Sequence, residues 1–361
     1  MTVRITVDPG EPDPRHIAEA AEILENGGLL AFPTETVYGL GALERDANAC
    51  EKLRLLKERP AEKPFTLLLH DAGEVCRRAT RLSIAAQRLM KRFWPGPLSM
   101  VLPTGTPGEE GTTGFRIPAC TVTLALLSRL SSPLIAPSAN PAGCPPALNA
   151  DEVMEFFDGK IDAVLDSGPV QLQEPSSVVR VGKEGIELLR EGALSLEELE
   201  GAARGATILF VCTGNTCRSP MAEGLFKKLL GEKLGVEIDE LPKLGYRIVS
   251  AGTSAFGGSC ASEEAVEVLR ERGGDIESHV SRPLSEELLR EADRIYALTS
   301  SHQMGILALG ATVDLPGPAL EHILGPLAGG DISDPIGLDV NGYRLCADEI
   351  EQGLEKILES L

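Results

Sequence analysis

The sequence predicts an α/β protein composed of two domains. The chain has 361 residues, whereas a single domain usually has roughly 100–200 residues. Both halves alternate short apolar strands with amphipathic helices, which is the pattern of α/β folds. Small, glycine-flanked residues at 201–205 are typical of a linker. We therefore expect one domain over residues 1–203 and a second over residues 204–361.

The elements of the first half follow from apolar periodicity. Apolar residues three and four positions apart predict an amphipathic helix, and short apolar runs closed by turn residues predict strands. Ile17, Ala20, Ala21 and Leu24, for example, share one face of a helix over 16–26. The other expected elements are strands over 29–33, 66–69, 99–102 and 133–136, and helices over 47–57, 83–93 and 121–130.

The second half opens with an apolar strand over 207–211, which leads directly to Cys212. A helix is expected over 221–230. Ser219 is a favourable N-cap for that helix, and Pro220 suits its first position. The residues from Cys212 to Arg218 therefore connect the end of a strand with the start of a helix.

Composition and charge narrow the function classes. The formal net charge is -20, with 43% hydrophobic and 24% charged residues. A generally acidic surface repels nucleic acid and anionic membranes, so we expect no strong nucleic-acid binding and no membrane association. No apolar stretch approaches the ~18 residues of a membrane span, and the N-terminus lacks an apolar signal-peptide core. These features favour a cytoplasmic protein.

The cysteine pattern indicates neither a disulfide framework nor a metal site. The chain contains eight cysteines, and no two of them form a Cys-x-x-Cys pair. We therefore assign no metal ligands. A reducing compartment would also keep a catalytic thiol reduced.

The segment that starts at Cys212 carries the strongest functional signal. A loop between a strand and a helix N-terminus gathers free backbone N–H groups and the positive end of the helix dipole, which together bind phosphate. The same field favours the nucleophilic thiolate of Cys212. Arg218 supplies a planar guanidinium that can hold two phosphoryl oxygens. The other residues assigned to the loop are Thr213, Gly214, Asn215, Thr216, Cys217 and Ser219.

The Cys-x5-Arg-Ser pattern resembles the low-molecular-weight protein tyrosine phosphatase family. The resemblance extends to residues 250–253, 279–284 and 331–337. It implies a domain with a parallel sheet flanked by helices, and a cysteine-dependent phosphatase whose partner is a phosphorylated protein.

The phosphatase resemblance also implies a mechanism. An Asp-Pro pair near the C-terminus supplies the family's general acid, which here is Asp334. Cys212 attacks phosphorus, and water then hydrolyses the phosphocysteine without any cofactor. Asn215 and Ser219 are expected to brace the loop. Cys217 is either a disulfide partner that protects Cys212 or a packed thiol.

Thr216 bears on the phosphatase substrate. Bacterial protein-arginine phosphatases, one branch of the family, have threonine just before the second loop cysteine, where tyrosine phosphatases usually have an aliphatic residue. We therefore favour phosphoarginine over phosphotyrosine, although Ile336 stands where an aromatic residue is common. An alternative is an arsenate-reductase-like enzyme, for which Cys260 and Cys346 are candidate redox cysteines.

Polar clusters follow several predicted elements of the first half, at 33–40, 57–64 and 136–140. Three or four cations together with loop hydroxyls and an amide suit a polyphosphate ligand. The pattern Gly-x4-Gly-Lys-Ser/Thr is absent, so a Walker-type ATPase is excluded.

These clusters together resemble the YrdC-like threonylcarbamoyl-adenylate synthase family over about residues 12–195. The family joins L-threonine, bicarbonate and ATP into threonylcarbamoyl-adenylate, which feeds the t6A modification of tRNA. The resemblance implies a twisted, open α/β sheet, Mg²⁺ bound with ATP, and t6A-transfer proteins as further partners. The motifs that carry it lie at 33–40, 93–98, 175–179 and 189–193, and in Lys57-x-Arg59 and Ser138-x-Asn140.

The same resemblance assigns the residues of this first site. ATP and the carbamate are expected to contact Lys57, Arg59, Lys63, Ser138, Asn140 and Arg190. L-Threonine is expected to contact Thr34, Arg116 and Ser177. An alternative is a domain that only binds RNA or a nucleotide. The whole chain is thus predicted to be a bifunctional enzyme.

Overall fold

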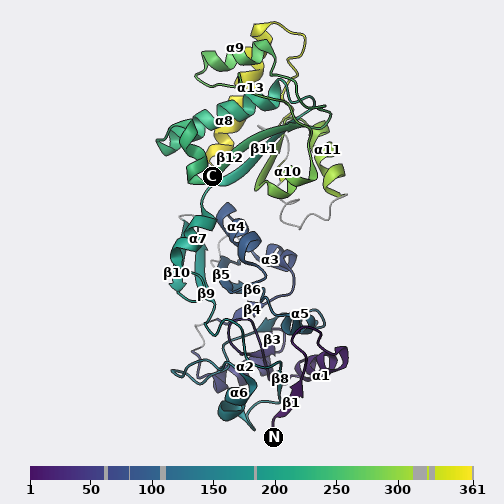
Figure 1. Ribbon diagram of the computed structural model, residues 1–361, viewed down its shortest axis with the longest axis vertical. Coiled ribbons are helices and arrows are strands. Elements are labelled where there is room, and N and C mark those ends of the chain that lie inside the picture. The colour runs from purple at the N-terminus through teal and green to yellow at the C-terminus, as the bar shows by residue number, and fades with distance from the viewer. Residues whose placement is uncertain are drawn as a thin grey trace. The chain divides into compact units, whose positions relative to one another are not determined.

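The computed structural model describes residues 1–60, 64–80, 82–105, 111–182, 185–311, 323–324 and 330–359. The chain forms two compact units, Met1–Ala203 and Arg204–Leu361 (Figure 1). Each unit is described here by itself. None of the helices in these ranges has the length and apolarity that crossing a membrane requires.

The first unit is built on one mixed sheet. Its strand order is β1-β8-β2-β3-β7-β4-β6-β5-β9-β10, where neighbours such as β1 and β8 run parallel and others such as β2 and β3 run antiparallel. The strands are β1 (Val3–Thr6), β2 (Leu30–Phe32), β3 (Gly39–Leu43), β4 (Thr66–Leu68), β5 (Leu98–Pro103), β6 (Thr112–Arg116), β7 (Leu134–Ile135), β8 (Ala163–Asp166), β9 (Ser177–Gly182) and β10 (Gly185–Arg190).

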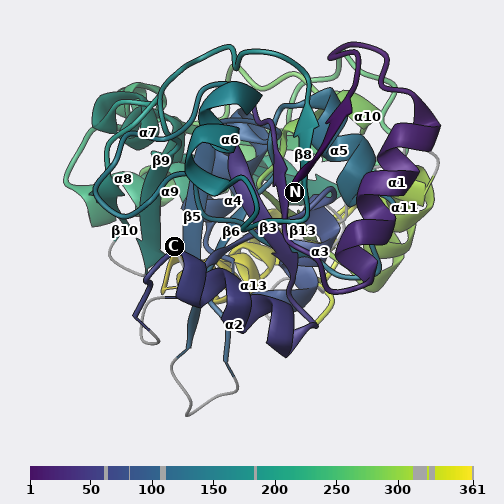
Figure 2. The same cartoon turned by 90° about the horizontal axis from the view of Figure 1, so that it is seen from below.

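Helices cover both faces of this sheet, because its strands are apolar on both sides. Leu30 and Phe32 of β2 belong to a core with α1 and α5, whereas Ala31 belongs to a second core with α2, α4 and α6. Figure 2 shows α1 beside α5. The helices are α1 (Pro14–Glu25), α2 (Ala47–Leu56), α3 (Ala72–Arg78), α4 (Ile84–Phe93), α5 (Thr121–Leu127), α6 (Ala150–Phe157) and α7 (Leu196–Ala203).

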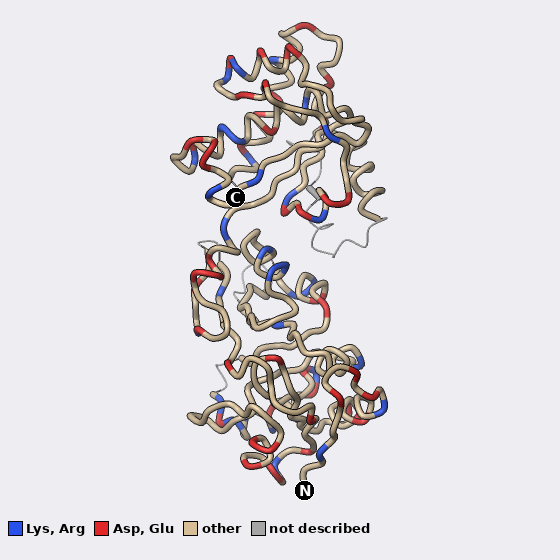
Figure 3. Tube along the Cα trace, viewed as in Figure 1, with Lys and Arg blue, Asp and Glu red and all other residues tan. Residues whose placement is uncertain are grey.

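Helix α7 extends further than expected, into the predicted linker. Residues 201–203, which the sequence placed in the linker, are the last turn of this helix. The helix packs on α4, where Nε of Arg88 donates a hydrogen bond to the Ala202 carbonyl at 3.1 Å. Glu197 and Glu198 begin α7, and Lys91 and Arg92 end α4, so the charges of the two helices are complementary (Figure 3).

The second unit contains a parallel sheet in the order β12-β11-β13-β14. Its strands are β11 (Ala206–Cys212), β12 (Tyr246–Gly252), β13 (Arg294–Ala297) and β14 (Ile323–Leu324). Its helices are α8 (Arg218–Leu234), the 3-10 helix η1 (Ile238–Leu244), α9 (Glu263–Glu271), α10 (Glu286–Glu291), α11 (Ser300–Ala311) and α13 (Val340–Glu359).

Alternate residues of β11 are buried on opposite faces of this sheet. Leu209 and Val211 pack with residues of α10 and α11. Phe210 meets Phe226 of α8 edge-on, with ring centroids 5.6 Å apart, and stacks on Tyr296. The predicted fold class, an open α/β sheet followed by a parallel sheet flanked by helices, is therefore confirmed.

The start of α8 differs from the expectation. The helix begins at Arg218 with Cys217 in the N-cap position, so Ser219 and Pro220 lie inside its first turn. Ser219 cannot cap the helix, because its hydroxyl already contacts Cys212 and Asn215. The Ser219 hydroxyl therefore binds residues of the loop and does not cap the helix.

Candidate active sites

The first unit contains a cavity of about 680 Å³. Among the described residues that line it, Glu58 is the single acidic one. The cavity is therefore strongly cationic within an acidic chain, which suits an anionic ligand. Its polar lining residues include Thr34, Lys57, Arg59, Thr66, Ser99, Arg116, Ser138, Asn140, Ser176 and Arg190.

Lys57 holds one wall of the cavity. It is the C-cap residue of α2, and its Nζ donates to the Ser138 carbonyl at 2.7 Å, to the Asn140 carbonyl, and to Oδ1 of Asn140 at 3.3 Å. These acceptors use all three ammonium protons. Burial, and then the charge of Arg59, lower the pKa of Lys57 to about 8. The ammonium group thus ties the end of α2 to the loop that follows β7.

The loop after β7 and the neighbouring Arg59 complete this wall. The Ser138 hydroxyl donates to Oδ1 of Asn140 at 2.5 Å, and Nδ2 of Asn140 donates to the Cys144 carbonyl at 2.5 Å. The guanidinium of Arg59 lies 4.9 Å from the centre of the Phe65 ring. Burial lowers the pKa of Arg59, and Arg54 adds to the effect. Two cations and a polar loop therefore face the cavity from this side.

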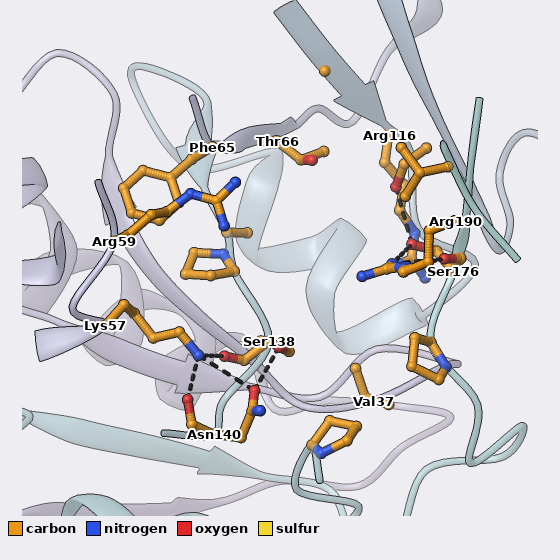
Figure 4. Close-up of a pocket in the computed structure, with 18 of the residues that line it drawn as sticks. Val37, Lys57, Arg59, Phe65, Thr66, Arg116, Ser138, Asn140, Ser176 and Arg190 are labelled. Atoms are coloured by element: carbon orange, nitrogen blue, oxygen red, sulfur yellow. Dashed lines mark hydrogen bonds between the residues drawn. The ribbon is translucent and has the colours of Figure 1, made fainter. Parts of the chain in front are cut away.

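Two arginines occupy the other side of the cavity (Figure 4). Arg190, at the end of β10, donates through Nε and Nη2 to the Ser176 carbonyl at 3.1 and 2.6 Å. Arg116 ends β6 and donates through Nη2 to Glu35 and Thr36, at 2.8 Å each. Burial lowers the pKa of Arg190, and the charge of Arg116 lowers it further. An anion between the two guanidinium groups would relieve their repulsion.

The turn after β2 is held by its own hydroxyl groups. The Thr34 hydroxyl donates to the Val37 carbonyl at 2.6 Å and pairs with the Thr36 hydroxyl at 2.8 Å. The backbone N–H groups of Thr36 and Val37 donate to the Thr34 hydroxyl oxygen at 3.2 Å. Thr34 lines the cavity, but its hydroxyl is committed to the turn in this structure.

The second unit builds its site around Cys212, at the end of β11. The sulfur lies 2.9 Å from the Ser219 hydroxyl, and the Asn215 backbone N–H donates to it at 3.3 Å. Nδ2 of Asn215 donates to the Ser219 oxygen at 2.9 Å, and the Ser219 proton can reach the sulfur at 2.9 Å or the Ala251 carbonyl at 3.4 Å. The Ser219 hydroxyl and the Asn215 backbone N–H stabilise a thiolate, and the start of α8 adds its dipole.

Asn215 fixes the conformation of the predicted phosphate loop, which runs from Cys212 to Arg218. Its φ of 55° lies in the left-handed region, which asparagine tolerates better than most residues. Its Nδ2 also donates to the Ser250 hydroxyl, which donates to Glu223 at 2.7 Å. The ring of His279 contacts its carbonyl at 2.8 Å. Buried partners therefore hold this strained residue in place.

Glycine is required where β12 passes the loop. A Cβ at Gly252 would lie 2.4 Å from the Thr213 carbonyl oxygen and 3.0 Å from the Asn215 nitrogen. Both neighbours are backbone atoms of the phosphate loop, which cannot move aside without distorting the site.

Arg218 and Asp334 form the remaining part of this site. Nη2 of Arg218 and Oδ2 of Asp334 are 2.6 Å apart, and Nη1 donates to the Ile332 carbonyl at 3.3 Å. His302 of α11 contacts the Thr213 hydroxyl through Nε2 at 2.8 Å. Burial, and then the charge of Arg218, lower the pKa of His302 to about 4. A cysteine thiol, an arginine and a carboxyl group thus meet at one loop.

Family models match both units. Residues 22–192 match the model of Sua5, YciO and YrdC proteins, described as telomere recombination. Residues 207–361 match the model of low molecular weight phosphotyrosine protein phosphatase. The chain joins these two families. Its first unit is a YrdC-type domain and its second is a low-molecular-weight phosphatase domain, which confirms both resemblances seen in the sequence.

Individual relatives resemble the YrdC-type domain. The threonylcarbamoyl-AMP synthase of Pyrococcus abyssi is 39% identical over 187 residues, which are 50% of this chain and 55% of that protein. The threonylcarbamoyl-AMP synthase of Bacillus subtilis is 35% identical over 206 residues, 55% of this chain and 59% of that protein. The chain therefore matches little more than half the length of these relatives. The crystal structure of E. coli YciO is 26% identical, with a TM-score of 0.51, and covers 55% of this chain and 100% of that one.

The structure gathers most of the predicted residues of the YrdC-type domain. Thr34, Lys57, Arg59, Arg116, Ser138, Asn140 and Arg190 all line the cavity. Lys63 lies outside the described residues. Ser177 does not line the cavity: it is fully buried, its hydroxyl donates to the Leu194 carbonyl at 2.6 Å, and the Leu194 N–H donates to it. Its neighbour Ser176 faces the cavity instead, because adjacent residues of an extended segment point to opposite sides.

The predicted residues of the phosphatase domain lie on the phosphate loop or contact it. Asp334 reaches the loop through Arg218. Cys217 is buried, and its sulfur lies 3.3 Å from the Tyr343 hydroxyl. The loop's supports were missed from the sequence, because they are single polar residues scattered through the chain: Glu223, Ser250, His302 and Tyr343.

Proposed function

We propose that the YrdC-type domain makes threonylcarbamoyl-adenylate from L-threonine, bicarbonate and ATP for the t6A modification of tRNA. The main support is the cavity, which has four cationic side chains on two facing walls although the chain as a whole is acidic. Both relatives described above are threonylcarbamoyl-AMP synthases, a name that denotes the same product. Proteins that transfer the product to tRNA are expected partners.

In this proposal different residues of the cavity bind the two reactants. Arg116 holds the threonine carboxylate through its guanidinium fork. The threonine amine takes up CO2 as a carbamate, whose oxygen attacks the α-phosphorus and expels pyrophosphate. Two anions must approach each other, so Lys57 and Arg59 screen their repulsion. The remaining polar residues expected at the nucleotide are Ser138, Asn140 and Arg190.

We expect Mg²⁺ to enter with ATP. In the part of the chain that the structure describes, no three His, Cys, Asp or Glu side chains gather as a metal site. The cavity instead offers hydroxyl groups such as those of Ser138 and Thr66. Mg²⁺ on the phosphates would neutralise charge that develops at phosphorus.

A pyrophosphate assay tests this synthase function against the binding-only alternative. We expect the full chain to release pyrophosphate from ATP only when L-threonine and bicarbonate are both present. Arg116→Ala should raise the KM for L-threonine by about 100-fold or more, because a charge-assisted bidentate contact is lost. Nucleotide binding without threonine-dependent pyrophosphate would identify a binding module instead.

We further propose that the second domain hydrolyses phosphorylated protein residues through a phosphocysteine. Cys212 attacks phosphorus while Asp334 protonates the leaving atom. Asp334 then deprotonates the water that cleaves the phosphocysteine. Arg218 and the loop N–H groups stabilise the equatorial oxygens. A reducing, cytoplasmic location suits this thiol chemistry.

Phosphoarginine is the substrate we favour, because of Thr216. Its hydroxyl lies 3.6 Å from where a Cβ on Gly214 would stand, and 3.6 Å from the Cys217 sulfur. The hydroxyl thus lies against the phosphate loop, where it can hydrogen-bond a guanidinium group or the attacking water. An aliphatic group of the same size could do neither.

Thr216→Ile tests this preference. We expect the ratio of kcat/KM for phosphoarginine over that for phosphotyrosine peptides to fall by about 10-fold, because one hydrogen bond to the substrate is lost. p-Nitrophenyl phosphate, which has neither guanidinium nor peptide, serves as the control for an intact loop. An unchanged ratio would refute the role of Thr216.

The arsenate-reductase alternative needs accessible redox cysteines after the loop. Cys260 is exposed, but Cys346 is buried, and burial raises its pKa to about 12. A thiol that stays protonated is a poor nucleophile, so the phosphatase interpretation is favoured. Comparing rates on arsenate and on phosphoarginine decides between the two.

A further inference from the structure

A buried ion pair stands behind the arginine wall of the YrdC-type cavity. Nη2 of Arg116 and Oε1 of Glu35 are 2.8 Å apart, and the two side chains are only 8% and 5% exposed. Glu35 itself does not line the cavity. Its backbone is fixed too, since its carbonyl accepts from the Leu172 N–H at 2.8 Å.

The donors of Arg116 divide into two sets. Nε donates to the Gly96 carbonyl at 3.2 Å, and the two Nη2 protons go to Glu35 and Thr36. A guanidinium has five N–H donors. No described residue accepts from the remaining two, which are on Nη1, although the side chain lines the cavity.

The contact with Glu35 is one-sided. Only Oε1 meets Arg116, and Oε2 is buried without a hydrogen-bond partner among the described residues. A fork-to-fork pair would have used Nη1 as well. The end-on contact therefore neutralises the arginine and fixes its plane, but leaves Nη1 to another acceptor.

We propose that Glu35 is a positioning residue for L-threonine, which orients Arg116 so that its Nη1 end meets the amino-acid carboxylate. The inference rests on the proposed synthase function. Arg190 lines the same side of the cavity, so a counter-charge beside Arg116 lowers the repulsion between the two guanidinium groups. Glu35 offsets the charge of Arg116, while Arg190 keeps its charge for the nucleotide.

The test measures binding of L-threonine and of L-threoninamide, which lacks the carboxylate, to the full chain by calorimetry. In Glu35→Gln we expect L-threonine to bind about 10-fold more weakly and L-threoninamide to bind as in the wild type. Thr36→Val removes the other acceptor of Nη2 without changing the charge. It should weaken the binding of L-threonine, but not of L-threoninamide, by a smaller factor than Glu35→Gln does. Glu174→Gln is the matched control, since this exposed carboxylate lies near Ser176 in the sequence but contacts neither arginine, and should change nothing.

The outcomes separate this inference from the proposed function. Unchanged L-threonine binding in both Glu35→Gln and Thr36→Val overturns the inference. Parallel weakening of L-threonine, L-threoninamide and ATP also overturns it, because a purely structural role would act on all three. If the wild-type chain binds no L-threonine, the proposed function fails first and the inference falls with it.

Discussion

Replacing Cys212 by serine is expected to lower the phosphatase rate by about 10⁴-fold or more while leaving the synthase rate unchanged. A serine hydroxyl is a far weaker nucleophile than a thiolate. The Ser219 and Asn215 contacts remain available to the new oxygen, so the loop should still bind phosphate. Phosphate release from p-nitrophenyl phosphate and from a phosphoarginine protein measures the effect.

Two controls accompany the Cys212→Ser variant. Cys260→Ser changes an exposed thiol of the same unit and should keep full phosphatase activity. Threonine-dependent pyrophosphate release by the same preparation reports on the other domain. A residual phosphatase rate near that of the wild type would mean that Cys212 is not the nucleophile.

Replacing Lys57 by methionine is expected to lower the synthase rate by about 100-fold to 1,000-fold. The ammonium group screens the approaching anions, and it also holds the loop at Ser138 and Asn140 through three hydrogen bonds. Lys52→Met, on the exposed side of the same helix, should have no effect. The measurement is again pyrophosphate release that depends on L-threonine and bicarbonate.

The lowered pKa of Lys57 gives this prediction a pH signature. The group is a cation below about pH 8 and neutral above it, so wild-type kcat/KM for ATP should fall as the pH rises through about 8. Lys57→Arg keeps its charge throughout this range, so whatever activity it retains should not show the fall. A wild-type profile that is flat through this pH range and beyond it would contradict the assigned role.

The sequence was informative where a pattern is local. The helix over 16–26 and the strand over 29–33 were expected from periodicity, and α1 and β2 occupy them within two residues. Strand β3, in contrast, was missed: its residues Gly39–Leu43 are buried on both faces and include two glycines, so they show no alternation. The Phe32 ring lies where a Cβ on Gly39 or Gly41 would stand, a close approach that only the folded sheet reveals.

The residues of the candidate sites were likewise predictable only where they lie close together in the sequence. Cys212 and Arg218 were found because one loop holds them together. Glu35 lies inside a recognised motif, yet its partner Arg116 is 81 residues away, and no spacing rule connects the two. Ser177 was expected at the threonine site, whereas Ser176 lines the cavity. The sequence does not show which of two adjacent serines points inward.

The ion pair between Arg218 and Asp334 has a consequence for substrate entry. The proposed general acid pairs with the guanidinium that must receive the phosphoryl group. In the proposed mechanism each substrate must therefore displace an internal competitor before Arg218 can hold its phosphoryl oxygens. The Asp334 side chain is 48% exposed, so breaking its ion pair with Arg218 costs only about 1 kcal/mol. We therefore expect this ion pair to weaken the binding of any anion at Arg218 by no more than about fivefold.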